Sequence, residues 1–227
     1  MIVVLTYDAP HRKTQDLLFR LVAKGYKNIL VAATPWQERP AFKALIRHRP
    51  TEAIPIPLRE FCKSLGYPFQ VVRAEELFSF LLQEGGEPVL IAGAGILSKE
   101  VIERRKVINA HPGHLPVVRG LDAFKWAVYE DLPIGVTTHV VSEEADAGFL
   151  IRQQLVPVDR WDSFHSVATR QYEMEIAMLA DAVEDLKKAA LTPLDDRRYP
   201  VRRRMPHEKE KELFARFQKL VEKSNKG

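Results

Sequence analysis

The chain carries the stretch VINAHPGHLPVVRG at residues 107–120, and this stretch decides the fold. Val107 and Ile108 are typical of the end of a buried strand, and Pro112-Gly113 indicates a turn. In open α/β sheets, ligands bind just outside the carboxyl ends of the strands. Asn109 and His111 therefore lie where chemistry is expected, and in an extended backbone their side chains point to the same side of the chain.

Apolar runs of strand length alternate with amphipathic helical patterns through the first half of the chain. We predict strands at residues 2–5, 28–33, 69–72, 89–92 and 106–108, and helices at 15–23 and 74–83. Strands separated by helices form parallel βαβ units. The pattern therefore predicts an α/β, Rossmann-like fold with a mostly parallel twisted sheet flanked by helices. The continuously apolar runs agree with a sheet that is buried on both faces.

The pattern changes after residue 120. We predict a helix at 122–130, two longer strands at 134–141 and 149–156 joined by an acidic loop, a long amphipathic helix at 162–190 and a last helix at 208–223. The proline-containing region 35–57 is predicted only as helical or irregular.

Composition excludes several classes of protein. The 46% hydrophobic content suffices for a core, but no apolar run approaches the roughly 20 residues that span a bilayer, so we expect no membrane partner. The N-terminal residues resemble a first strand more than a signal peptide, and a cytoplasmic location follows as the expectation. The single cysteine, Cys62, excludes an intramolecular disulfide and a multi-cysteine metal site.

The net charge of +4 is concentrated in the tail. Residues 195–227 carry 11 Lys or Arg and 6 Asp or Glu, whereas the residues before them are nearly balanced. Such a segment can meet phosphates, nucleic acid or a membrane surface. It is equally typical of a solvated C-terminal helix, and the sequence leaves both interpretations open.

Asn109, His111 and Asp146 form the candidate catalytic set. A histidine exchanges protons near neutral pH, a carboxylate can orient it, and an Asn amide can donate to an oxyanion. No G-x-S-x-G motif is present, so the set suits direct attack on an acyl carbon. Spacing alone favours a turn Asn with a capping or core His. No metal site is predicted, because His and carboxylates lack metal-ligand spacing.

Three segments together suggest a family. Asn109-Ala110-His111-Pro112 is followed by Leu115-Pro116 and Gly120, and Asp146-Ala147-Gly148 comes later, with Asp146 seven residues after His139. This combination resembles the hallmark of the folate-dependent formyltransferases, although Gly113 stands where Ser is commoner. Ala92–Ser98 is similar to the loop of that family that receives the folate ring. The likeness runs from about Val89 to Pro157.

The resemblance implies a mechanism and a donor. An amine would attack the formyl carbon of 10-formyltetrahydrofolate while Asn109 and protonated His111 stabilise the oxyanion and Asp146 orients His111. The catalytic domain would span residues 1–190, with a C-terminal basic extension containing a helix at 191–227. The residues expected to bind the donor are Gly93, Ile96, Leu97, Val141 and Glu144.

The acceptor is inferred by comparison within the family. Members that formylate glycinamide ribonucleotide carry a glycine-rich phosphate loop after the first strand, whereas Thr6–Arg12 contains no glycine. Members that formylate methionyl-tRNA carry an additional C-terminal domain, and here a short tail follows the long predicted helix. The leading expectation is a nucleotide-linked amino sugar, because Arg119–Trp126 and the tail resemble members that act on such substrates. The residues expected to bind it are Tyr7, Asp8, Arg12, Arg119 and Lys125.

Two alternatives stay open. The first is an enzyme similar to methionyl-tRNA formyltransferase, in which the basic tail replaces the missing domain. The second is a non-catalytic nucleic-acid-binding protein on the same fold, against which the presence of all three candidate catalytic residues argues. The sequence leaves the oligomeric state open, a homodimer included.

Overall fold

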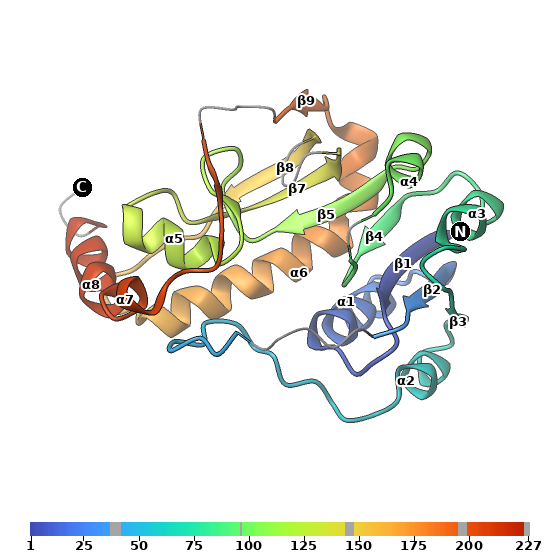
Figure 1. Cartoon of the computed structure of the whole chain (residues 1–227), viewed down its shortest axis with the longest axis horizontal. Coiled ribbons are helices and arrows are strands. Elements are labelled where there is room, and N and C mark those ends of the chain that lie inside the picture. Colours follow the sequence, from blue (N-terminus) through green and yellow to red (C-terminus); the bar gives the residue numbers. More distant parts are fainter. Residues whose placement is uncertain (37–41, 96, 144–147, 195–198, 225–227) are drawn as a thin grey trace.

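The computed structural model of the chain describes residues 1–36, 42–95, 97–143, 148–194 and 199–224. Its main feature is a sheet with the strand order β3-β2-β1-β4-β5-β7-β8-β9 (Figure 1). The strands β1 (Ile2–Tyr7), β2 (Ile29–Thr34), β3 (Phe69–Val71), β4 (Val89–Ile91) and β5 (Val107–His111) are parallel. Antiparallel pairing adds β7 (Gly135–Val141), β8 (Gly148–Leu155) and β9 (Thr192–Pro193). The predicted α/β fold with a mostly parallel sheet is confirmed.

Helices cover both faces of the sheet, which explains why its strands are continuously apolar. Val4 and Val31 face α1 (Arg12–Ala23), α2 (Leu58–Ser64) and α6 (Phe164–Lys188) within one core cluster. Val3 and Leu5 point to the opposite face, where α3 (Leu77–Gln83) and α4 (Lys99–Arg104) complete a second cluster. In Figure 1, α6 runs along the sheet and continues beyond its end toward α5 and α7.

A third core cluster forms beyond that end of the sheet. Here α5 (Ala123–Glu130) and α8 (Leu213–Ser224) pack around the first turns of α6, with Leu213 and Phe217 buried beside Phe124 and Phe164. The C-terminal extension is therefore part of the same packed body. A two-residue parallel pairing of β10 (Val201–Arg202) with β6 (Arg119–Gly120) ties it to the His-Pro segment.

The last predicted helix is divided in two. Residues 208–223 were expected to form one helix, but α7 (His207–Glu210) ends before α8 begins at Leu213. At the end of α7, Glu210 is fully buried and accepts a hydrogen bond from the backbone amide of Leu45 at 2.7 Å. The expectation of a single helix was therefore wrong.

The strand order places the candidate site at one edge of the sheet. β1 lies between β2 and β4, so the chain leaves β1 on one side and later returns to its other side. Ligands of open α/β sheets bind at such a switch point, beyond the carboxyl ends of the strands. Tyr7 ends β1, Gly93 follows β4 and His111 ends β5, so the predicted residues gather at this edge. Among the described residues, none of the helices combines the length and apolarity that crossing a membrane would require.

Candidate active site

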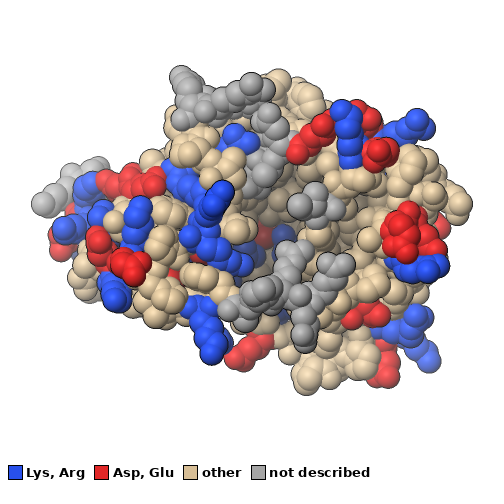
Figure 2. Space-filling view, in the orientation of Figure 1, with Lys and Arg blue, Asp and Glu red and all other residues tan. Residues whose placement is uncertain are grey.

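A cleft of about 1360 Å³ opens at this edge of the sheet. The predicted residues that it brings together are Tyr7, Arg12, Gly93, Asn109, His111 and Lys125. Figure 2 shows a hollow in the middle of this face, with Lys and Arg side chains gathered on one flank. The structure thus places the two candidate catalytic residues of β5 in the same cavity as most of the residues expected to bind the acceptor.

His111 is held in a narrow space. Its side chain is buried, and its Nε2 lies 2.9 Å from the carbonyl oxygen of Val118. A carbonyl oxygen only accepts, so this contact favours the tautomer with a proton on Nε2. A Cβ atom at Gly113 would lie 2.7 Å from that same Nε2 and 2.6 Å from the Val118 oxygen. The absence of a side chain at residue 113 is therefore a requirement for this position of the ring.

Buried polar side chains fix the turn after His111. The hydroxyl of Thr137 on β7 donates to the Gly113 carbonyl at 2.8 Å and accepts from the Leu115 amide at 3.1 Å. Gln171 on α6 donates to the Pro112 carbonyl at 3.1 Å. The Leu115-Pro116 peptide bond is cis. These contacts attach the turn to two elements of the core, so the sequence motif has a defined shape and not a loose loop.

The expected donor side is built from two neighbouring loops. Tyr7 packs so closely against Gly93 that a Cβ atom at residue 93 would lie 2.8 Å from the Tyr7 ring. The Tyr7 hydroxyl donates to the Ala94 carbonyl at 2.5 Å. Leu97 and Val141 are both half-buried against one core cluster. An ion pair of 2.8 Å joins Lys99, the first residue of α4 after one loop, to Glu143 in the other loop. Half-buried apolar side chains beside backbone polar groups suit a flat heterocycle such as a pterin ring.

Lys125 has a different environment from the one expected. Its ammonium is fully buried and forms an ion pair with Glu210, which also accepts from the Leu45 amide. Lys125 lines the cleft, but its charge is already neutralised, and we do not propose it as a ligand of the acceptor. Arg119 is buried outside the cleft lining, and Asp8 is exposed and also outside it. Of the five residues expected to bind the acceptor, only Tyr7 and Arg12 remain candidates.

Arg12 stands at the cleft in a polar cluster. Its Nε donates to Asp16 at 2.7 Å, and the Tyr172 hydroxyl donates to the same carboxylate at 2.7 Å. The Arg12 side chain keeps 42% of its surface exposed, so part of the guanidinium remains open to a ligand. Burial, followed by the hydrogen bond to Asp16, raises the pKa of Tyr172 above its usual range. Tyr172 therefore remains a neutral donor.

Glu175 is a site residue that the sequence analysis missed. Its side chain is 1% exposed and lies 2.8 Å from Lys13 and 2.6 Å from Arg49. Burial opposes its ionisation, but Arg49 and Lys13 outweigh burial and hold its pKa below the usual value. Burial, and next the charge of Lys13, lowers the pKa of nearby His11 to about 4, so that His11 is neutral at pH 7. A signal was present, since Gln171 and Glu175 interrupt the apolar face of α6 one turn apart.

Two further segments line the cleft without having been predicted. The first, residues 42–51, is called the strap here; Gln15 fixes the chain just beyond it through paired hydrogen bonds with Ile54, at 2.8 and 2.9 Å. The second is Arg202–Arg204 of the C-terminal extension. Arg202 pairs with Glu130 at 2.5 Å and Arg204 with Asp122 at 3.1 Å. Both segments depend on contacts between distant parts of the chain, which local patterns do not reveal.

Three predicted residues lie outside the described residues. They are Asp146 of the catalytic set and the expected donor-binding residues Ile96 and Glu144. Within the described ranges, no group of three or more His, Cys, Asp or Glu side chains is placed to hold a metal ion.

Solved structures share this fold. A sugar N-formyltransferase from a Shewanella species aligns with a TM-score of 0.62 and 21% identity, covering 90% of this chain and 77% of that one. Phosphoribosylglycinamide formyltransferase from Anaplasma phagocytophilum aligns with a TM-score of 0.60 and 24% identity, covering 83% and 88%. At these identities the likeness shows the fold.

Curated relatives include enzymes named for different acceptors. Methionyl-tRNA formyltransferase from Synechocystis sp. is 26% identical over 156 residues, which cover 65% of this chain and 47% of the relative. A dTDP-4-amino-4,6-dideoxyglucose formyltransferase from Mycobacterium bovis is 29% identical over 96 residues, or 41% of each protein. The chain thus spans about half the length of the curated relatives that it matches.

The family model described as Formyl transferase matches residues 27–183, which include β5, the His-Pro turn and most of α6. That range contains Asn109 and His111 of the cleft and Glu175 at its wall. The chain therefore belongs to the formyl transferase family.

Proposed function

We propose that this chain transfers a formyl group from 10-formyltetrahydrofolate to the primary amine of a nucleotide-linked sugar. The observation that carries the proposal is that Asn109 and His111 open into one cleft with a basic wall. Asn109 and His111 suit acyl transfer, and the basic wall suits an acceptor that carries phosphate.

Asn109 and His111 would divide the chemistry between them. The amine would attack the formyl carbon of the donor. The bond between that carbon and N10 would then break, and the proton lost by the amine would pass to the leaving nitrogen, which releases tetrahydrofolate. The Asn109 amide can donate a hydrogen bond where negative charge develops on the formyl oxygen. Because the Val118 carbonyl accepts from Nε2 of His111, proton exchange would use Nδ1 of the same ring. We propose that Asp146 orients this ring, as the family motif implies.

The donor would lie between the two loops next to the Lys99–Glu143 ion pair. We propose that Leu97 and Val141 pack against its ring and that Gly93 allows close approach of the backbone. Ile96 and Glu144 of the same loops are proposed to bind the donor as well. Tyr7 closes the space behind Gly93, since it fills the position that a side chain there would take.

The acceptor would lie along the basic wall. The cations that line the cleft are Arg12, Lys13, Lys43, Arg47, Arg49, Lys125, Arg202, Arg203 and Arg204. Several are neutralised by Glu175, Glu210, Glu130 or Asp122. Arginine can grip a phosphate with two donors, so this wall can replace a glycine-rich cradle.

A methionyl-tRNA acceptor is the second candidate. Arg202–Arg204 of the extension reach the cleft, so basic residues could meet the end of a nucleic acid there. Several of the matched curated relatives are methionyl-tRNA formyltransferases.

One assay separates the two candidates. The purified chain is incubated with 10-formyltetrahydrofolate and either a panel of UDP- and dTDP-linked amino sugars or charged initiator tRNA, and formylated product is measured by mass spectrometry. We expect product from a nucleotide sugar, formed about 100- to 1000-fold more slowly when Asn109→Ala replaces the wild type. Formylation of methionyl-tRNA alone would overturn the proposed acceptor and leave the formyl-transfer chemistry intact.

A further inference from the structure

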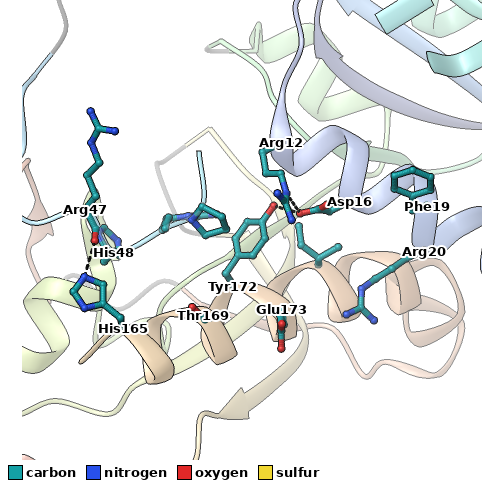
Figure 3. Close-up of a pocket in the computed structure, with 13 residues that line it drawn as sticks. Arg12, Asp16, Phe19, Arg20, Arg47, His48, His165, Thr169, Tyr172 and Glu173 are labelled. Carbon is teal, nitrogen blue, oxygen red and sulfur yellow. Dashed lines mark hydrogen bonds and ion pairs between the residues drawn. The ribbon is translucent and has the colours of Figure 1, made fainter. Parts of the chain in front are cut away.

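A second cavity of about 500 Å³ lies between α1, the strap and α6 (Figure 3). It meets the active-site cleft along Arg12, Tyr172 and residues 47–50, which line both. Phe19 and Arg20 line only this second cavity. We call it the nucleotide groove, and the chemistry proposed above assigns it nothing.

The nucleotide groove is elongated. Figure 3 shows Arg47 and His165 at one end, Arg12 and Tyr172 meeting at Asp16 in the middle, and Phe19 and Arg20 at the other end. The part of α6 that lines it runs from His165 to Ile176, a rise of about 16 Å. Arg12, Tyr172 and residues 47–50 line both this groove and the cleft that holds Asn109, so a ligand could extend from one cavity into the other.

The charges along the groove favour an anion. Two of its four arginines are already paired, Arg12 with Asp16 at 2.7 Å and Arg49 with Glu175 at 2.6 Å. In the part of the chain that the structure describes, Arg20 and Arg47 form no ion pair with a carboxylate, and both are exposed. Glu173 and Asp16 are the acidic residues of the lining, which therefore contains four arginines and two carboxylates.

The apolar part of the groove suits a flat ring. Phe19 lies on α1 and is 46% exposed, and its ring packs against Phe61 with ring centroids 5.1 Å apart. Tyr172 and Ile176 of α6, which are both largely buried, also line the groove. Aromatic side chains bind planar groups by stacking, and neighbouring arginines donate hydrogen bonds to the oxygen acceptors of the same ligand.

We propose that this groove binds the nucleoside diphosphate half of the acceptor, an inference that rests on the proposed function. The diphosphate would lie between Arg47 at one end and Arg12 in the middle, and the base against Phe19 and Arg20 at the other end. The sugar would then extend into the cleft with its amine toward Asn109. Binding the nucleotide on one side of the strap and the sugar on the other would select the whole molecule over a free amino sugar.

The test uses two variants whose side chains do not line the cleft. Phe19→Ala and Arg20→Ala are compared with wild type by calorimetric titration of the full chain with UDP and with dTDP. We expect each to weaken binding about tenfold or more, the effect typical of a residue that anchors a ligand. Arg104→Ala removes the same charge from an exposed position on α4 and should leave both titrations unchanged. In the formylation assay, the variants should raise KM for the nucleotide sugar without lowering kcat, and should leave turnover of the free amino sugar unaltered.

The outcomes distinguish this inference from the proposed function. If UDP or dTDP binds wild type and both variants equally, the nucleotide binds elsewhere and the inference is wrong, while the proposed acceptor stands. If neither nucleotide binds the wild type, the inference and the nucleotide-sugar acceptor both fall. Formyl transfer to another amine would then show that the chemistry itself is correct.

Discussion

A Cβ atom at Gly113 would lie 2.7 Å from Nε2 of His111, closer than real Cβ contacts allow. The ring and the Val118 carbonyl occupy the space that a side chain would need, so Gly113 positions His111 by leaving room for it.

Gly113→Ala should therefore impair catalysis more than stability. The methyl group has to displace the His111 ring or the Val118 carbonyl, and a shift of about 1 Å in a reacting group costs about 10- to 100-fold in rate. The measurement is kcat in the formylation assay, together with the melting temperature. Gly86→Ala is the matched control, since nothing lies within 4 Å of its Cβ position. Full activity of Gly113→Ala would show that the ring tolerates displacement.

Asn109→Ala should lower turnover by about two to three orders of magnitude while the protein stays folded, because one oxyanion donor contributes about that much. Asn109 lines the cleft and is not needed to fill the core. Asn28→Ala, at an exposed position before β2, controls for the loss of an amide. Near-wild-type kcat of Asn109→Ala would exclude the proposed role.

Glu175→Gln should destabilise the fold by about 3 kcal/mol, the lower end of the range for breaking a buried ion pair, since Arg49 and Lys13 keep some solvent contact. The folded-state pKa of Glu175 lies below its ordinary value of 4.5, so its stabilisation is fully present above pH 4.5 and is lost as the pH falls through the folded-state pKa. Urea unfolding at pH 7 and in acid measures both effects.

For that experiment, Glu173→Gln on the exposed side of the same helix is the control and should change stability little. The difference between wild type and Glu175→Gln should shrink in acid. A difference that stays constant down to pH 3 would show that the charge of Glu175 is not what stabilises the fold.

His48 should make the fold sensitive to mild acid. Burial, followed by the charges of Lys125 and Arg49, lowers its pKa to about 3 from an ordinary 6.5. The neutral ring therefore stabilises the fold above pH 6.5, and this contribution declines as the pH falls from 6.5 toward 3, where the unfolded chain binds the proton more readily. Urea midpoints at pH 7.5 and 5.5 should differ less for His48→Gln than for wild type. His165→Gln, at the exposed start of α6, should keep the wild-type pH dependence.

The sequence predicted those parts of the fold whose signals are local. The apolar runs located the strands of the sheet, and the His-Pro turn identified Asn109 and His111, which the structure places in one cleft. β5 extends to His111 and not only to Ile108, because β7 pairs with the polar residues at its end. That pairing joins residues about thirty positions apart, and no local pattern shows it.

The missed parts of the site depend on distant contacts. The strap has no regular periodicity, and its place is set by Gln15, Glu175 and Glu210. The two-residue strand β10 exists only because β6 lies beside it. Lys125 was expected to bind the acceptor because it belongs with Arg12 and Arg119 to the basic residues near the strand ends, and the position of its partner Glu210, 85 residues later, could not be inferred from sequence.

The meeting of Leu45, Lys125 and Glu210 has a consequence for the order in which the protein matures. During synthesis, the first strands and the His-Pro turn leave the ribosome well before residue 210 has been joined to the chain. Until then the Lys125 ammonium has no carboxylate, the Leu45 amide has no acceptor and the wall of the cleft is not closed. A growing polypeptide could thus hold Asn109 and His111 in place and still lack a finished pocket. The binding of substrate would begin only once α7 has left the ribosome and Glu210 has reached Lys125 and Leu45.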